Sequence, residues 1–149
     1  MIRSVNIRVY GVLVNHQKQV LVSDERIYYN NLEVTKFPGG GLEPGEGPKD
    51  CVIREAKEEI GIAVEVTDHL YTTDFFQQSA FNPEHQILSI YYLIQPLEPL
   101  DALVHNGPAV YPEKVSEIFR WVDWDYFDEN TMTLPIDRLV ARLLKEKYK

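Results

Sequence analysis

Apolar and polar positions near the start of the chain follow a pattern that predicts extended structure. Apolar side chains dominate alternate positions over residues 5–14, which is typical of a half-buried strand. A polar turn at residues 15–18 separates this run from a second apolar run at residues 19–22, so the pattern predicts a hairpin. Residues 23–36 are polar and aromatic without a clear period, and they predict a loop.

Glycines mark the next segment and precede a predicted helix. The glycines of residues 39–41 and the Pro44-Gly45 pair are expected to exclude regular structure. Pro48 suits the first turn of a helix that runs to about Ile60, and Gly61 is expected to end it.

The second half of the chain predicts three more strands. Apolar and aromatic runs at residues 62–76 and 86–94 indicate two of them, joined by a loop at residues 77–85. Prolines crowd residues 95–112 and predict an extended surface loop, after which a strand is expected at residues 118–122.

The C-terminal part predicts helical structure. Asp123 is expected to cap a short helical turn that reaches Asp128, and Pro135 suits the start of a final helix. Apolar residues at helical spacing indicate a helix that packs on a core. These residues are Ile136, Leu139, Val140, Leu143 and Leu144.

Composition narrows the class of protein. A chain of 149 residues with 44% hydrophobic and 26% charged residues fits one globular domain over residues 1–149. The net charge of −8 argues against a surface that binds a nucleic acid polymer or an anionic membrane. The single Cys51 cannot form an intramolecular disulfide, and no signal-peptide core or transmembrane stretch is recognised, so we expect a cytoplasmic protein.

The predicted helix after the glycines carries three carboxylates on one face. Glu55, Glu58 and Glu59 have the spacing i, i+3, i+4, while apolar residues occupy another face. Like charges at this spacing destabilise a helix unless a positive charge lies between them, and a divalent cation is the simplest partner. Oxygen ligands suit Mg²⁺ or Mn²⁺. A solvated acidic face is the alternative, and the carboxylates alone do not decide between the two.

Residues 40–62 as a whole resemble the Nudix box. The stretch contains Gly40, then five residues, Glu46, then seven residues, and Arg54-Glu55 leading into Glu58-Glu59 and the Gly61-Ile62 pair. At average residue frequencies this pattern recurs by chance less than roughly once in a million chains of this length. The resemblance also includes the preceding residues 37–39. It implies an α+β fold, an α/β/α sandwich with a mixed β-sheet between helices.

The resemblance also implies a chemistry and a set of site residues. Nudix hydrolases cleave a nucleoside diphosphate linked to another moiety by attack of water on phosphorus. By position, the metal-binding carboxylates are Glu55, Glu58 and Glu59, and the carbonyl of Gly39 is a backbone ligand. Arg54 is expected to orient the carboxylates, because its guanidinium holds a carboxylate in a rigid fork. Glu46 is expected to fix the loop onto the helix.

The general base is open among three residues. The family places this base on a box glutamate or on a downstream acidic loop, so Glu55, Glu113 and Glu117 are candidates, with Glu55 favoured narrowly. A solvated acidic surface is an equally good interpretation of Glu113 and Glu117, which lie in or near the proline-rich loop.

Aromatic residues outside the box are candidates for stacking on a nucleobase. Tyr28 and Tyr29 rank first because a polar loop has little core to fill, and Phe75, Phe76 and Phe81 follow. Each of them has the alternative role of a core residue. The box itself is compatible with a nucleotide sugar, a dinucleotide or a modified nucleoside triphosphate as the substrate.

A different class of function stays open beside the enzyme. A Nudix-like module can sense a nucleotide without cleaving it, although decayed carboxylates usually mark such modules and all are present here. The expected partner is a small nucleoside diphosphate derivative. The resemblance also admits a homodimer.

Overall fold

The computed structural model describes residues 1–27 and 31–148. Its α-carbon contacts divide the chain into two compact units. The first comprises Met1–Leu13 and Pro38–Leu100, and the second comprises Val14–Phe37 and Asp101–Lys149. Among the residues described, each unit contains one four-stranded sheet and one α-helix, which agrees with the expected α+β class.

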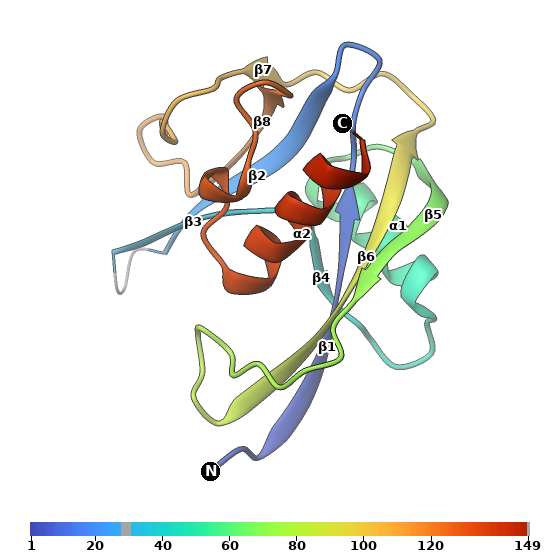
Figure 1. Ribbon diagram of the computed structural model, residues 1–149, viewed down its shortest axis with the longest axis vertical. Coiled ribbons are helices and arrows are strands. Elements are labelled where there is room, and N and C mark those ends of the chain that lie inside the picture. Colours follow the sequence, from blue (N-terminus) through green and yellow to red (C-terminus); the bar gives the residue numbers. More distant parts are fainter. Residues whose placement is uncertain (28–30, 149) are drawn as a thin grey trace. The chain divides into compact units, whose positions relative to one another are not determined.

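The sheet of the first unit has the order β4-β1-β6-β5 (Figure 1). Its central strands β1 (Ser4–Val12) and β6 (His85–Pro96) run parallel, whereas β4 (Gly39–Gly41) and β5 (Val64–Thr72) pair antiparallel to them. Helix α1 (Pro48–Glu59) packs on this sheet. The sheet is therefore mixed, as expected.

Gly11 allows α1 to approach the sheet closely. A Cβ atom at this position would overlap the Ile94 side chain and would lie 3.1 Å from Cγ2 of Val52 on the helix. Val52 and Ala56 form the buried face of α1 against the sheet. This packing fixes the rotation of the helix, and with it the direction in which its glutamates point.

The sheet of the second unit has the order β3-β2-β8-β7. It contains β2 (Gln19–Ile27), β3 (Leu32–Lys36), β7 (Leu103–Val104) and β8 (Glu117–Asp123). The short 3₁₀ helix η2 (Glu129–Thr131) and helix α2 (Pro135–Lys147) follow. Within the described residues, neither α-helix has the length and apolarity that crossing a membrane requires.

The predicted helices agree with the structure. Helix α1 begins at Pro48, and Gly61 follows its end with a positive φ of 85°, which favours glycine. Helix α2 buries Ile136, Val140 and Leu144 from the predicted apolar stripe. The helical turn expected after Asp123 forms, because the Asp123 carbonyl accepts from the N–H groups of Tyr126 and Phe127. The Asp123 carboxylate does not cap it, since its oxygens accept from Gln19 and Asn106 instead.

The predicted hairpin at the start of the chain is wrong. The turn forms, with the Asn15 N–H donating to the Gln19 carbonyl, and a single bridge joins Val14 to Val20. Beyond that bridge the strands separate, since β1 pairs with β4 and β6 while β2 pairs with β3 and β8. A turn is determined by its local sequence, but the pairing of the strands on either side also depends on segments that are distant in the sequence.

Two segments predicted to be irregular are strands. Residues 23–27 form the end of β2, and residues 32–36 form β3. Asp24 and Thr35 are buried polar residues that bond to one another, and their polarity hides the period of the strands. The glycines of residues 39–41 form β4, which pairs with residues 8–10 of β1. Glycine suits this strand because a Cβ at Gly39 would overlap the Val9 carbonyl oxygen.

Candidate active site

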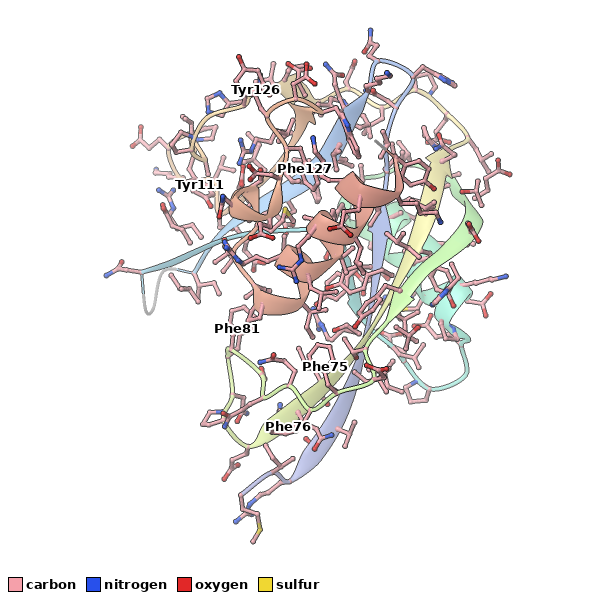
Figure 2. The ribbon with its side chains drawn as sticks, in the orientation of Figure 1. Phe75, Phe76, Phe81, Tyr111, Tyr126 and Phe127 are labelled. Carbon is pink, nitrogen blue, oxygen red and sulfur yellow. The ribbon has the colours of Figure 1, made fainter. Side chains whose placement is uncertain are left out.

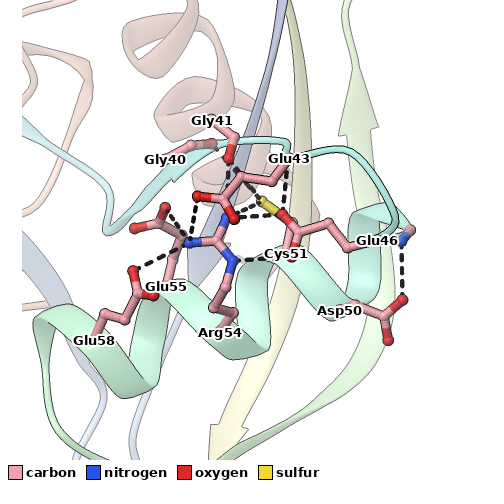
Figure 3. A network of polar contacts seen from close by, with 10 residues as sticks. Gly40, Gly41, Glu43, Glu46, Asp50, Cys51, Arg54, Glu55 and Glu58 are labelled. Carbon is pink, nitrogen blue, oxygen red and sulfur yellow. Dashed lines mark hydrogen bonds and ion pairs between the residues drawn. The ribbon is translucent and has the colours of Figure 1, made fainter.

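The glycine strand, the following loop and helix α1 form one continuous structure in the first unit (Figure 3). The loop is folded back on itself by a 2.9 Å hydrogen bond from the Glu43 N–H to Glu46 Oε1. At the start of the helix, the Gly47 N–H donates to Asp50 Oδ2 at 2.9 Å. These bonds place the loop against the exposed side of the helix.

Arg54 joins this loop to the helix through Glu46. Its Nε donates to Glu46 Oε2 at 2.9 Å and its Nη2 to Glu46 Oε1 at 2.7 Å, which is a bidentate pair. Nη2 also donates to the Gly41 carbonyl at 3.1 Å. The Arg54 hydrogen bonds and the Glu43 N–H lower the pKa of Glu46 to about 2. The expectation that Glu46 fixes the loop onto the helix is therefore confirmed.

The same guanidinium contacts three further carboxylates. Arg54 Nη1 donates to Glu55 Oε1 at 3.0 Å and to Glu58 Oε2 at 3.1 Å, and it lies 3.7 Å from Glu43 Oε1. These partners, led by the hydrogen bonds with Glu46, raise the pKa of Arg54 above its ordinary value. Because one cation serves four carboxylates, this cluster keeps a large excess of negative charge.

Gly40 forms the wall opposite Glu55. A Cβ at Gly40 would overlap the Glu55 carboxylate, so only glycine allows the backbone of β4 to lie directly against it. The Glu55 side chain is 12% exposed, whereas that of Glu58 is 59% exposed. The structure thus brings Gly40, Arg54, Glu55 and Glu58 into one region. Gly39 precedes Gly40 on β4, and Glu59 follows Glu58 on α1.

The donors suit a hard divalent cation, although they do not form a closed site. No three His, Cys, Asp or Glu side chains converge as a metal centre within residues 1–27 and 31–148. Arg54 Nη1 bridges Glu55 and Glu58 instead. The carboxylates are nevertheless the oxygen donors that Mg²⁺ and Mn²⁺ prefer. Glu55 lies against the backbone of Gly40, at a place where a Cβ would overlap it.

Cys51 lies beside this cluster and has a packing role. It is fully buried, with its Sγ 3.5 Å from the Gly41 carbonyl oxygen. Burial, together with the hydrogen bond and charge of Glu46, raises the pKa of the thiol to about 12. The thiol is therefore protonated at neutral pH and is a poor nucleophile.

Arg8 is a cation near this region that sequence analysis did not single out. It lies on β1 opposite Gly41, and its Nε donates to the Tyr10 hydroxyl at 3.4 Å. Burial alone would lower the pKa of Arg8, but Tyr10 and the charges of Glu55 and Glu59 raise it overall. Its local sequence gives no signal of this position, because a charged residue between alternate apolar residues is ordinary in a half-buried strand.

The two alternative bases belong to the second unit. Glu117 lies on β8, where its Oε2 accepts a 3.2 Å hydrogen bond from Ser23 Oγ and is 3.9 Å from Lys36 Nζ. Glu113 is exposed in the loop before β8. Glu117 thus has a cation partner of its own, whereas Glu113 has the solvated position that was the alternative interpretation.

The aromatic candidates have separate outcomes. Tyr28 and Tyr29 lie outside the described residues. Phe81 is 48% exposed in the connection between β5 and β6, where Phe75 and Phe76 are also exposed (Figure 2). The Phe81 N–H donates to Ser79 Oγ within that connection. None of these three phenylalanines is a buried core residue, so the alternative role does not apply to them.

Comparisons with known proteins agree with the resemblance of residues 40–62 to the Nudix box. The family model described as the NUDIX domain matches residues 5–143. The mouse protein named nucleoside diphosphate-linked moiety X motif 6 is 31% identical over 85% of this chain and 37% of its own length. The 8-oxo-dGTP diphosphatase of Escherichia coli strain K12 is 33% identical over 35% of this chain and 40% of its own. The chain therefore spans well under half of these curated relatives.

A solved structure supports the fold. The MutT protein of Methanosarcina mazei Go1 superposes with a TM-score of 0.67 and 23% identity, covering 100% of this chain and 99% of that one. This likeness identifies the Nudix fold, and the family model adds a match that includes the whole box. The chain belongs to the Nudix hydrolase family.

Proposed function

We propose that this chain is a Mg²⁺-dependent pyrophosphohydrolase, with Mn²⁺ as an alternative metal. The substrate is a nucleoside diphosphate linked to another moiety, and water attacks phosphorus to cleave the pyrophosphate bond. One observation carries the proposal: Glu55, Glu58, Glu46 and Glu43 gather around the single cation Arg54, beside a glycine wall. Family membership supports it, since Nudix hydrolases generally use divalent metal ions.

Glu55, Glu58 and Glu59 would hold the metal, with the Gly39 carbonyl as a backbone ligand. The excess negative charge around Arg54 favours binding of a cation, because each added positive charge relieves repulsion between carboxylates. When bound, the cation would neutralise phosphate charge and lower the pKa of water.

Arg54 positions the carboxylates. It fixes one oxygen of Glu55 and one of Glu58 while the pair with Glu46 holds its own guanidinium in place. Because Arg54 bonds three carboxylates, its side chain loses little conformational freedom when substrate binds, and Glu55 and Glu58 are already oriented.

Glu55 is our choice for the general base. Arg54 bonds its Oε1, whereas Oε2 accepts no hydrogen bond from the described residues, so Oε2 can accept a proton from water. Glu117 is less suitable because its carboxylate already pairs with Lys36. Glu113 is an exposed loop residue and stays the second choice.

Three classes of substrate stay open in this proposal. The similarity to an 8-oxo-dGTP diphosphatase supports a modified nucleoside triphosphate, while nucleotide sugars and dinucleotides contain the same diphosphate. Tyr28, Tyr29 and Phe81 stay our candidates for stacking on the base. We keep the cytoplasm as the proposed compartment, because the one thiol in the sequence has no intramolecular partner for a disulfide.

The test is turnover by wild type and by Glu59→Gln with Mg²⁺ and a panel of nucleoside triphosphates, nucleotide sugars and dinucleotides. We expect wild-type hydrolysis of at least one class, its loss in EDTA, and a decrease on the order of 100-fold or more in the variant. Glu146→Gln, which removes an exposed carboxylate of α2, is the matched control and should be as active as wild type.

Wild-type rates in Glu59→Gln would refute the metal assignment. Stabilisation of wild type by a nucleotide that stays intact would instead favour the sensing module.

A further inference from the structure

Arg8 has an unusual environment for a partly buried arginine. It is 5.9 Å from the ring centroid of Tyr10 and bonds the Tyr10 hydroxyl, but it forms no ion pair with any described carboxylate. Arg54, in contrast, has four carboxylate neighbours. A guanidinium carries five N–H donors, so most donors of Arg8 are left for a further acceptor.

The glycine strand β4 separates Arg8 from the carboxylate cluster. Successive side-chain positions on a strand point to opposite faces. A Cβ at Gly40 would meet the Glu55 carboxylate, whereas a Cβ at Gly41 would lie 3.5 Å from Arg8 Nη1. A strand without side chains therefore lies between a carboxylate on one face and a guanidinium on the other.

Tyr10 restrains the guanidinium from one side only. The Tyr10 ring is 5% exposed and stacks on Tyr91, with 5.0 Å between ring centroids. Its hydroxyl therefore has a fixed position, and the bond to Nε directs Arg8 without using Nη1 or Nη2. Arg8 is therefore held in place while its Nη1 and Nη2 donors stay available to an acceptor.

We infer that Arg8 forms a phosphate-binding subsite, which holds non-bridging oxygens of the substrate diphosphate. This inference rests on the proposed function. A carboxylate in an ion pair would cancel the charge of Arg8, but Arg8 forms no ion pair with a described carboxylate, and the charges of Glu55 and Glu59 act on it through their field. A diphosphate oxygen matches the vacant donors in charge and in bidentate geometry. The acidic cluster then serves the cation and Arg8 serves the anion.

The test compares Arg8→Met and Arg8→Lys by calorimetry with two probes, Mn²⁺ alone and imidodiphosphate in the presence of Mg²⁺. For Arg8→Met we expect imidodiphosphate to bind about 10- to 100-fold more weakly, because charge-assisted hydrogen bonds are lost. Mn²⁺ alone should bind about 2- to 10-fold more tightly, because a positive charge near Glu55 and Glu59 is removed. Arg8→Lys keeps the charge and should weaken imidodiphosphate by less, with Mn²⁺ unchanged.

Arg3→Met is the matched control. Arg3 precedes β1 and is exposed, and Glu84 is its one ion-pair partner among the described residues. Its removal therefore changes the net charge equally without touching the subsite. Both probes should bind this control as they bind wild type.

Opposite shifts of the two probes distinguish the subsite from a structural role. If Arg8→Met and Arg8→Lys weakened both probes together, Arg8 would act through the fold. If imidodiphosphate binding were unchanged in both variants of an active wild type, the subsite would be refuted while the hydrolase stood. Absence of turnover and of Mn²⁺ binding in wild type would refute the proposed function itself.

Discussion

Each unit contains an arginine that bonds carboxylates, Arg120 in the second and Arg54 in the first, and the two differ in the number of carboxylates per guanidinium. In the second unit, Arg120 Nε and Nη2 donate to the two oxygens of Asp24 at 2.7 Å and 3.2 Å. Nη1 donates to the carbonyls of His105 and Gly107. The side chains are 7% and 0% exposed, so one cation meets one anion inside the core.

Arg54 in the first unit is arranged in the opposite way. It meets four carboxylates, its side chain is 23% exposed, and the surplus charge remains negative. A buried pair with balanced charge is complete by itself, whereas an excess of negative charge at a partly exposed position favours binding of a further cation. The number of carboxylates per cation is therefore the difference between Arg120, which balances a buried charge, and Arg54, to which we assign a positioning role.

Removal of Arg120 gives the largest expected effect on stability. Arg120→Met leaves the Asp24 carboxylate buried with a hydroxyl from Thr35 and no cation. We expect the free energy of unfolding to fall by about 3 to 5 kcal/mol, measured by urea denaturation.

The exposed pair of Arg142 and Glu129 provides the control. Arg142→Met removes a 3.1 Å ion pair whose side chains are 55% and 35% exposed, and it should cost at most about 1 kcal/mol. An equal loss in the two variants would contradict the claim that Arg120 balances a buried charge.

Gly40→Ala should come next, with its effect on activity rather than on folding. The added methyl group overlaps the Glu55 carboxylate and displaces it from Arg54. Displacement of Glu55, our proposed general base, should lower kcat/KM on the order of 100-fold, which the turnover assay measures.

Gly107→Ala is the matched substitution in the second unit. A Cβ there lies 3.6 Å from the nearest atoms of His105, which is ordinary contact, so activity should stay at the wild-type level. Full activity of Gly40→Ala would show that the close approach of Gly40 to Glu55 has no catalytic role.

Local signals explain how much of the fold could be predicted from sequence. Helix α1 follows from Pro48, an amphipathic period and Gly61, all within its own segment. The order of strands depends on contacts between distant segments, so a real turn at residues 15–18 led to a wrong pairing. Strand β3 was missed because Thr35 is polar and is stabilised by the distant residues Asp24 and Thr133.

The site divides in the same way. The motif places Glu46, Arg54 and Glu55 together because helical spacing and a short loop determine their distances. Arg8 reaches the region only through the pairing of β1 with β4, which no local pattern reveals. Short-range chemistry was therefore predictable, whereas the cation contributed by another strand required the structure.

Acid should weaken the first unit through Glu46, which is the smallest of these effects. Its ordinary pKa of 4.5 applies to the unfolded chain, while bonds from Arg54 lower the folded value to about 2. Between these values the unfolded chain binds more protons, so the stabilisation is complete above about pH 4.5 and is lost as the pH falls toward about 2.

Urea denaturation at pH 7 and pH 3 should show that Glu46→Gln is less stable than wild type at pH 7, with a smaller difference at pH 3. Glu146→Gln should show no such dependence, because Glu146 is exposed and forms no ion pair with the residues that the structure describes, so it contributes equally little at both values. If the difference for Glu46→Gln were the same at both pH values, the Arg54 pair would not be the bond that ties the loop to the helix, and the contrast with the self-contained Arg120 pair would lose its electrostatic basis.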